Sequence, residues 1–447
     1  MQTLQSIVNY IINDLGSIVF MPMIMFIIGK IVRMKTKDAI SAGLMLGVAF
    51  SCVNAASGLL SGVMSPTLKE FVNQTGINLN TLDVSVSIRA AMTWQWPYVF
   101  LIFPMQWGIN FLMLLLNKTK TINVDMWNIH NKGFIALLVW HITGNVFVAL
   151  GWVAVIIVIE LIIGDTIQAR VQELCGVPLV TVPHSELTLC APMYAIDRYI
   201  LRKIPGLDRK FDLTVLRQKI GFWSESHIIG FIVGTGLGLA ARYPFAKALG
   251  IGVTLGSALV LLPMTARLFI TALEPISEAA GEFMKKRFSN REVYIGLDWP
   301  ILAGRNEKWV CDAILAPILI LFAFITPGNR TIPMASIYVS AAMMTAAMIV
   351  TNANMIRMLI LGVIFIPPSL LFATYVAPYI TELATKMNAY EVLEGQYITG
   401  LGQESRILRW GIIMISEGKL LGWGILAFWL ATFAIFIIGM RKETEKV

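Results

Sequence analysis

The sequence has unusually few charged residues. Of its 447 residues only 14% are Asp, Glu, Lys or Arg, whereas 57% are hydrophobic. A soluble domain carries about 25% charged residues, so the chain has too few charges to cover the surface of a water-soluble protein of this length. The mean hydropathy of +0.72 leads to the same conclusion. Composition therefore excludes a soluble enzyme or a soluble binding module.

Cysteines are few, and the familiar motifs of cofactor chemistry are missing. Cys52, Cys175, Cys190 and Cys311 lie in apolar or border segments without paired spacing. We interpret them as small packing residues, not as a disulfide framework or a zinc site. The sequence also shows no glycine-rich phosphate loop, no cluster of metal ligands and no catalytic triad. We expect neither a metal nor a cofactor.

What the sequence does contain is a series of long apolar runs. Each is about as long as a helix that crosses a bilayer, and none shows the alternation of a barrel strand. Backbone groups in lipid need internal partners, so the runs predict helices and an all-α polytopic membrane protein. The ten clear runs cover residues 17–30, 39–62, 97–117, 133–160, 226–242, 249–268, 311–326, 334–350, 358–378 and 418–440.

The N-terminal residues and the polar stretches between the apolar runs are assigned from their composition. The first 30 residues lack a basic start and a small-residue cleavage site, so the first run is expected to be retained. Met1–Leu15 is expected to form an amphipathic helix along the membrane interface. Residues 63–90 and 381–408 are polar enough to be loops or surface helices.

The formal net charge of +8 does not indicate nucleic-acid binding, because Lys and Arg gather in short segments between apolar runs. Such a distribution is typical of the cytoplasmic loops of membrane proteins. Placing every cluster inside puts the N-terminus outside and the C-terminus in the cytoplasm. The clusters are Lys30, Arg33, Lys35 and Lys37; Lys118, Lys120 and Lys132; Arg198, Arg202, Lys203, Arg209, Lys210, Arg217 and Lys219; Lys285, Lys286, Arg287 and Arg291; Arg357; and Arg441 with Lys442.

This orientation requires one more crossing, between the end of the fourth run near Asp165 and the basic cluster that starts at Arg198. The segment between them is interrupted by Pro178, Pro183 and Pro192. A second interrupted segment, Tyr294–Gly304, is too short to span a membrane. Paired broken segments in two halves of a transporter are the best sequence pointer to its substrate site. We therefore expect one membrane-embedded domain, 1–447, with halves 1–219 and 220–447 related by an inverted repeat.

The two broken segments supply the main site candidates. His184 lies in the first with Ser185 and Glu186, and Asp298 lies in the second, followed by Trp299. Ionisable groups at membrane depth are costly and usually functional. Asp298 could accept hydrogen bonds from several hydroxyls and could act as a general base, and Trp299 could stack on the C–H face of a polyol. The alternatives are that His184 caps a helix end and that Asp298 starts a helix.

His141 and Asn145 form a second pair of candidates. They are four residues apart in the fourth run, so on one continuous helix they would share a face. Substrate contact and a structural hydrogen bond between helices are equally compatible with that pattern.

Several stretches in order along the chain resemble the galactitol-specific enzyme IIC family of the phosphotransferase system. The chain departs from the family pattern at Ser185-Glu186, where a small pair is expected, and at Trp299, which stands between Asp298 and Pro300. The matching stretches are Asn123-Val124-Asp125-Met126-Trp127-Asn128, Val182-Pro183-His184, Lys203-Ile204-Pro205-Gly206, Ile295-Gly296-Leu297-Asp298 and Pro327-Gly328-Asn329. We interpret the first of these as an interfacial elbow, either structural or a contact for the IIB subunit.

The resemblance implies a homodimer similar to the ascorbate permeases, with about eleven membrane spans, two re-entrant hairpins, a scaffold part and a moving core. It also implies a polyol or sugar substrate that is phosphorylated by a phosphocysteine on a separate IIB subunit, itself supplied by a IIA subunit. We expect this phosphoryl chemistry to be supplied in trans, since no stretch of this sequence looks like a soluble IIB domain.

A second function remains open on the residues alone. A proton- or sodium-coupled sugar transporter would use Asp298, Glu186 or His184 as its ion site, and composition does not separate it from a phosphotransferase permease. A membrane-embedded enzyme with its own catalytic centre is the least favoured class, because no motif supports it.

Overall fold

The computed structural model is mostly helical. It describes residues 16–75, 79–84, 86–125, 128–209, 211–212, 214–215, 221–287, 292–333, 339–390, 392, 394–400 and 407–444. The α-helices are α2 (Gly16–Ile31), α3 (Thr36–Thr75), α4 (Val86–Gln95), α5 (Ile102–Leu115), α6 (Ile129–Thr143), α7 (Val146–Cys175), α8 (Cys190–Tyr199), α10 (Ser226–Ala240), α11 (Phe245–Arg287), α12 (Asn306–Ile325), α13 (Val339–Thr351), α14 (Met355–Lys386), α16 (Ile407–Ser416) and α17 (Leu420–Thr444). The expected interfacial helix Met1–Leu15 lies outside the described residues.

Five helical segments among the described residues are long and apolar enough to cross a membrane. They are Pro97–Leu115, Val146–Cys175, Asn306–Ile325, Met355–Lys386 and Leu420–Glu443. Large apolar side chains are exposed on the outside of the molecule, as expected for a surface in contact with lipid; Phe147 is 82% exposed and Leu420 is 85% exposed. The prediction of a multi-pass helical membrane protein is therefore confirmed.

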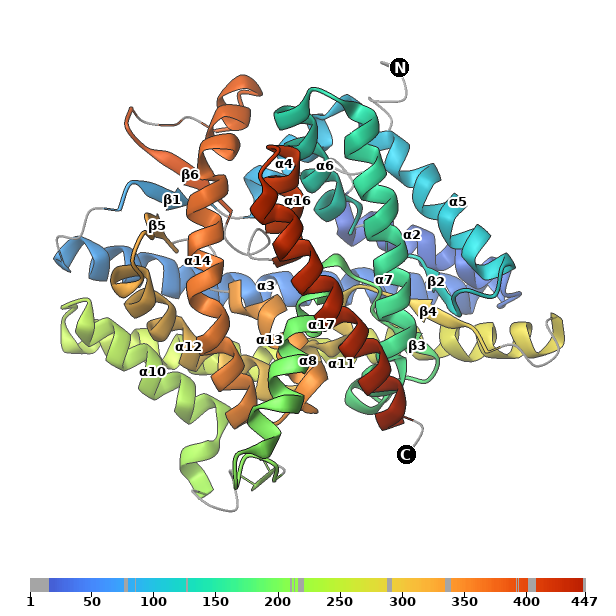
Figure 1. Cartoon of the computed structure of the whole chain (residues 1–447). Coiled ribbons are helices and arrows are strands. Elements are labelled where there is room, and N and C mark those ends of the chain that lie inside the picture. The colour runs from blue at the N-terminus through green and yellow to red at the C-terminus, as the bar shows by residue number, and fades with distance from the viewer. Residues whose placement is uncertain are drawn as a thin grey trace.

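The long helices run in two sets of directions. In Figure 1, α7, α14 and α17 run steeply from top to bottom, whereas α3 and α10 run across the view. Helices α10 and α11 pack backbone to backbone, since a Cβ at Gly234 would stand 2.8 Å from the Gly252 Cα. Small residues allow this close approach of helices where lipid provides no hydrophobic drive.

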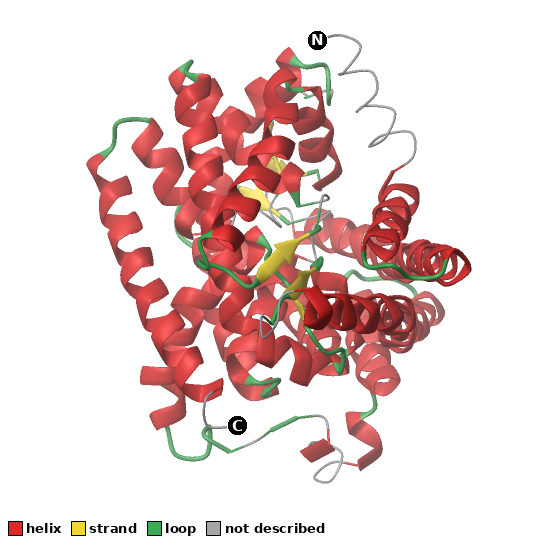
Figure 2. Ribbon diagram, turned by 90° about the vertical axis from the view of Figure 1, so that its right-hand side faces the viewer, coloured by secondary structure: helices red, strands yellow, loops and turns green. Residues whose placement is uncertain are grey.

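The described residues also include six short strands, which the sequence did not predict and which lie inside the helical shell (Figure 2). Each of the two sheets is parallel and three-stranded, with orders β5-β1-β6 and β2-β4-β3. The strands are β1 (Thr81–Asp83), β2 (Thr121–Asn123), β3 (Val180–Thr181), β4 (Tyr294–Gly296), β5 (Thr331–Ile332) and β6 (Tyr397–Thr399). Backbone groups of irregular segments thus find partners inside the protein, as they must at membrane depth.

The fourth apolar run, expected to be one helix over 133–160, is two helices. Gly144 ends α6 with a φ of 68°, and the Asn145 side chain caps α7 by accepting the backbone N–H groups of Phe147 and Val148. Glycine adopts this left-handed conformation readily, and asparagine is a preferred N-cap. The prediction that His141 and Asn145 share one helix face is therefore wrong.

The segment that follows also differs from its expected form. The interpretation that the fourth span ends near Asp165 is wrong, because this residue lies inside α7, which continues to Cys175. The proline-interrupted segment after it forms β3, the 3₁₀ turn η3 (Ser185–Leu189) and the ten-residue α8. Tyr294–Gly304, expected to be too short to span, is β4 followed by the 3₁₀ turn η6 (Trp299–Gly304).

Two basic residues need correction. Residues 63–90, expected to be loops or surface helices, are in part helical, since α3 continues to Thr75 and α4 begins at Val86. Lys132 and Arg357, counted among cytoplasmic loop residues, are buried inside the protein at 0% and 7% exposure. Lys132 pairs with Glu160 at 2.6 Å, and Arg357 pairs with Asp197 at 2.6 Å.

Candidate functional site

The sheet β2-β4-β3 brings the main candidate residues together. Asp125 follows β2, His184 follows β3 and Asp298 follows β4. The carboxyl ends of parallel strands meet at one edge of a sheet, where ligands bind in many open sheets. Three distant segments therefore place one ionisable side chain each at a common point.

Asp298 is buried, at 6% exposure. Its Oδ1 accepts the backbone N–H of Trp299 at 2.7 Å and so caps η6. The same oxygen lies 3.5 Å from the His184 Nε2. Asp298 thus starts a short helical turn, the structural alternative raised above, and at the same time faces the His184 segment.

His184 lies between two carboxylates. Its Nδ1 accepts the backbone N–H of Glu186 at 3.1 Å. A nitrogen that accepts a hydrogen bond carries no proton, so the neutral ring is protonated at Nε2. That nitrogen lies 3.5 Å from an oxygen of Asp298 and 4.0 Å from an oxygen of Asp125. His184 is therefore a helix-turn cap, and its Nε2–H lies close to both carboxylates.

Asp125 is a site residue that the sequence analysis did not single out. It is fully buried, and its Oδ1 accepts the backbone N–H of Asn128 at 3.1 Å. Of the two roles considered for Asn123–Asn128, structural or a contact for IIB, the burial of Asn123, Asp125 and Asn128 favours the structural one. The signal that could have found Asp125 is its place in a stretch that carries the family resemblance.

A chain of hydrogen bonds lies beside this cluster. The Arg409 Nη2 donates to the Ser185 Oγ at 3.2 Å, and Ser185 donates to the Asn128 Oδ1 at 3.1 Å. Asn128 in turn donates to the Glu160 Oε1 at 2.9 Å, and the other oxygen of Glu160 pairs with Lys132. All five residues are buried. Ser185 is thus oriented by a network that ends in a buried ion pair.

Glu186 and Trp299 flank the cluster. Glu186 is 5% exposed and Trp299 is half-buried. The Lys308 Nζ lies 5.1 Å from the centre of the Trp299 ring and pairs with Asp312 at 3.0 Å. One side of the Trp299 ring is therefore beside a buried cation.

His141 and Asn145 are not brought to this cluster. The His141 Nε2 lies 3.2 Å from a carboxylate oxygen of Glu382, and Asn145 caps α7. The Asn131 side chain of α6 lies 3.3 Å from the His184 Nε2, and His141 comes ten residues later, which is about 15 Å along the helix. These two candidates belong to the turn between α6 and α7.

Asp125, His184 and Asp298 also form the one group among the described residues whose geometry could hold a metal ion. Each offers one ligand atom, and the three atoms lie within 4.8 Å of one another. The same donors suit hydroxyl groups, because carboxylates accept and imidazole N–H groups donate hydrogen bonds.

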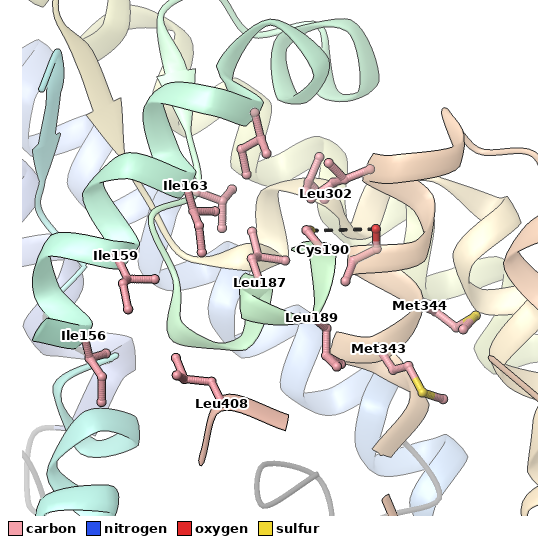
Figure 3. Close-up of a cluster of buried hydrophobic side chains, with 14 of the residues drawn as sticks. Ile156, Ile159, Ile163, Leu187, Leu189, Cys190, Leu302, Met343, Met344 and Leu408 are labelled. Carbon is pink, nitrogen blue, oxygen red and sulfur yellow. Dashed lines mark hydrogen bonds between the residues drawn. The ribbon is translucent and has the colours of Figure 1, made fainter. Parts of the chain in front are cut away.

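Apolar packing holds the η3 turn in place. Figure 3 shows Leu187 and Leu189 between Ile159 of α7 on one side and Met343 of α13 on the other. The Cys190 Sγ lies 3.9 Å from the Ala346 carbonyl oxygen, marked by the dashed line. Because this turn carries Ser185 and follows His184 directly, its packing fixes both residues against α7 and α13.

Comparison with known proteins places the chain in a family. The family described as "PTS system sugar-specific permease component" matches residues 10–393. The "Putative permease IIC component" of Escherichia coli strain K12 is 30% identical over 418 residues, which is 93% of this chain and 92% of that protein. The "PTS system galactitol-specific EIIC component" of the same strain is 28% identical over 410 residues, 92% of this chain and 90% of that protein. The same holds for its counterpart in Escherichia coli O157:H7, also 28% identical. The chain therefore belongs to the family of sugar-specific permease components of the phosphotransferase system, and it is a membrane permease subunit of such a system.

Proposed function

We propose that this permease subunit binds galactitol or a closely related polyol or sugar at the Asp125–His184–Asp298 cluster. It then carries the substrate across the membrane for phosphorylation by a separate IIB subunit. The observation that supports this most is the buried cluster itself, in which two carboxylates and an imidazole converge from three strands of one sheet. The galactitol specificity named for two of its relatives supports the substrate class.

The chemistry of the cluster suits several neighbouring hydroxyls. A carboxylate accepts hydrogen bonds from more than one hydroxyl, and such charged hydrogen bonds are the strong ones. The His184 Nε2–H supplies a donor between the two acceptors. Ser185 and Glu186 add a hydroxyl and a carboxylate from the next two positions, and Trp299 adds an apolar ring face for C–H groups. An open-chain polyol presents alternating donors, acceptors and C–H faces of this kind.

Asp298 is the proposed general base. In the transfer, the substrate hydroxyl oxygen attacks the phosphorus of a phosphocysteine on IIB, the O–P bond forms, and the S–P bond breaks with the cysteine leaving as thiolate. The hydroxyl proton passes to the Asp298 carboxylate, which the His184 imidazole faces. The phosphoryl group is supplied by IIB, which receives it from IIA, and no cofactor of the permease takes part.

The membrane arrangement is proposed to have about eleven crossings and two re-entrant hairpins, built from β3 with η3 and from β4 with η6. The extra crossing before Arg198 was expected in the proline-interrupted segment. Helix α7 supplies this crossing instead, since α7 is 30 residues long and apolar. The hairpin tips then meet at the cluster inside the protein, where irregular backbone is tolerated.

An inverted repeat with halves 1–219 and 220–447 is supported by the sheets. Apart from the helices between the first two strands of each half, α4 and α5 in one and α12 in the other, the order α2-α3-β1-β2-α6-α7-β3 recurs as α10-α11-β4-β5-α13-α14-β6. In addition, β1 and β4 are each the central strand of a sheet completed by the other half. The register recurs as well: the Val84 N–H donates to the Thr399 carbonyl at 2.8 Å, and the Leu297 N–H donates to the Thr181 carbonyl at 2.9 Å.

A cytoplasmic C-terminus and an outside N-terminus remain our proposal. Near the C-terminal end of α17, Glu443 pairs with Arg198 at 2.9 Å and with Arg202 at 2.6 Å. The largest basic cluster therefore lies on the same side as Arg441 and Lys442, as one cytoplasmic face requires.

We further propose a homodimer and an elevator-type movement, both implied by the family resemblance. An apolar cavity of about 310 Å³ between α10 and α12 supports the movement. Its lining includes Phe71, Ile232, Val233, Pro317, Ile320 and Phe324. Surfaces without hydrogen bonds between them can slide without leaving buried polar groups unpaired.

Uptake of radiolabelled galactitol in cells with and without the IIB subunit tests this function. We expect labelled galactitol phosphate inside the cell only when IIB is present, and little uptake without it. Accumulation of unmodified galactitol without IIB, abolished by a protonophore or by removal of sodium, would instead establish the coupled secondary transporter.

A further inference from the structure

The apolar cavity between α10 and α12 opens on the outer surface of the molecule. Its volume is about 310 Å³, and every residue that lines it is apolar. Two of the lining residues, Ile232 of α10 and Leu321 of α12, are 50% and 54% exposed, so they stand at the opening. Helix α12 is long and apolar enough to cross a membrane, and its exposed side chains therefore face lipid. The opening is thus accessible from the bilayer.

Small residues on α10 give the cavity an elongated shape. Gly236 and Ala240 follow Ile232 at intervals of four residues, so the three share one face of the helix and line the cavity together. A Cβ added at Gly236 would meet no neighbouring atom within 4 Å. Phe71 of α3 and Phe324 of α12 also line the cavity, with ring centres 6.4 Å apart. From Ile232 to Ala240 the cavity follows α10 for about 12 Å, a shape that suits one extended hydrocarbon chain.

Two basic residues lie just beyond the end of this slot. Arg242 follows the lining residue Ala240 by two positions, and Lys247 lies in the first turn of α11. Both are exposed, and no described carboxylate pairs with either. Between them, Tyr243 donates its hydroxyl to the Pro66 carbonyl of α3 at 3.4 Å, and its ring centre lies 3.5 Å from the Lys247 Nζ. Charges are costly deep in a bilayer, so this turn lies at the membrane surface.

We propose that one anionic phospholipid binds here, with an acyl chain in the slot and its phosphate at Arg242 and Lys247. The apolar slot offers a polar ligand no hydrogen bonds, whereas a hydrocarbon chain gains packing contacts along its whole length. Basic residues at a membrane surface attract acidic headgroups. The site is separate from the Asp125–His184–Asp298 cluster, and the inference does not depend on the proposed function. The acyl chain fills the gap between α10 and α12, the helix that follows the η6 turn.

Photo-crosslinking tests this site. The purified full chain is placed in phosphatidylcholine nanodiscs that contain a trace of phosphatidylglycerol with a diazirine on its acyl chain, and labelled residues are identified by mass spectrometry. Phe111 of the apolar span Pro97–Leu115 is 64% exposed and serves as the reference for ordinary lipid contact. Leu321 should be labelled at least fivefold more than Phe111. Replacing part of the phosphatidylcholine with unlabelled phosphatidylglycerol should remove this excess and leave the label on Phe111 unchanged.

A glycine variant that fills the slot provides the first control. Gly236→Phe places a ring in the open space beside Gly236, so the label on Leu321 should fall to the level on Phe111. Gly250→Phe is the matched variant, because Gly250 of α11 also has open space at its Cβ position but does not line the cavity. It should leave the label on Leu321 unchanged.

The headgroup contact is tested by the double variant Arg242→Gln with Lys247→Gln. Each lost charge should weaken competition by unlabelled phosphatidylglycerol about fivefold. Both residues are exposed, so this variant tests the site even if Gly236→Phe does not fold.

Three results would overturn the inference. Equal label on Leu321 and Phe111 in the unsubstituted chain would show that the slot has only ordinary lipid contact. Unchanged competition in the double variant would show that the two cations do not bind the headgroup. A dimeric chain with no label on the residues of the slot would show that a second copy covers it instead of a lipid.

Discussion

Replacing Asp298 with Asn tests the proposed base and the main acceptor of the cluster in a single variant. Asn keeps the size of the side chain and an Oδ1 that can accept the Trp299 N–H, now at 2.7 Å, so the η6 cap should survive. The variant loses the charge that faces the His184 imidazole at 3.5 Å. Its fold should therefore remain, while its chemistry changes.

The expected loss has two parts. A hydrogen bond to a charged group contributes about 1.5–3 kcal/mol, so affinity for galactitol should fall by roughly ten- to a hundredfold. A general base contributes about 10²–10⁴-fold, so phosphorylation at saturating galactitol should fall by about 10² or more. Equilibrium binding to the purified chain measures the first, and formation of galactitol phosphate with phosphorylated IIB measures the second.

Asp212→Asn serves as the control, because Asp212 is also buried and also caps a turn, accepting the Val215 N–H at 3.0 Å. It should leave both quantities near those of the unsubstituted chain. If Asp298→Asn bound galactitol and supported phosphorylation at the normal level, Asp298 would be neither the base nor a main acceptor, and His184→Ala would be the next variant to measure.

Three further outcomes follow from the structure. Lys132→Met leaves the fully buried Glu160 carboxylate without its cation, and should lower the free energy of unfolding by about 3–5 kcal/mol. A thermal melt measures this loss, and the double variant Lys132→Met with Glu160→Leu should recover most of it. An unchanged melting temperature of Lys132→Met would show that the pair contributes nothing. Gly296→Ala puts a Cβ 2.5 Å from the Pro183 Cγ, so it should displace Pro183, the residue before His184, and weaken galactitol binding at least tenfold. Unchanged binding would show that this segment adjusts without moving His184. A reporter enzyme fused after residue 447 should be active only in the cytoplasm, and periplasmic activity would reverse the proposed orientation.

The helical membrane fold follows from run length and pattern, because lipid admits only helices and closed barrels and the apolar runs lack the alternation of barrel strands. The break at Gly144 was missed because long apolar stretches lie before and after the short polar stretch Thr143–Asn145, so the average hydropathy stays high across the turn. The left-handed glycine and the capping Asn145 carry the signal, but they are single residues within a long hydrophobic run.

Two of the three cluster residues, His184 and Asp298, could be predicted from the sequence, and the third, Asp125, could not. His184 and Asp298 stand in short, interrupted segments, where an ionisable group needs an explanation. Asp125, Asn128 and Lys132 follow a basic pair and therefore resembled a membrane-surface loop. Only the pairing of β2 with β4, which joins segments over 170 residues apart, places them inside. Parallel pairing of three-residue strands leaves no periodic signal in a single sequence.

The most direct test of the central claim is a structure of the chain determined with galactitol bound. Polyol hydroxyls should lie within hydrogen-bond distance of Asp125, His184 and Asp298 at the carboxyl ends of β2, β3 and β4. A polyol bound elsewhere in the protein, with these three side chains in contact only with one another, would contradict it.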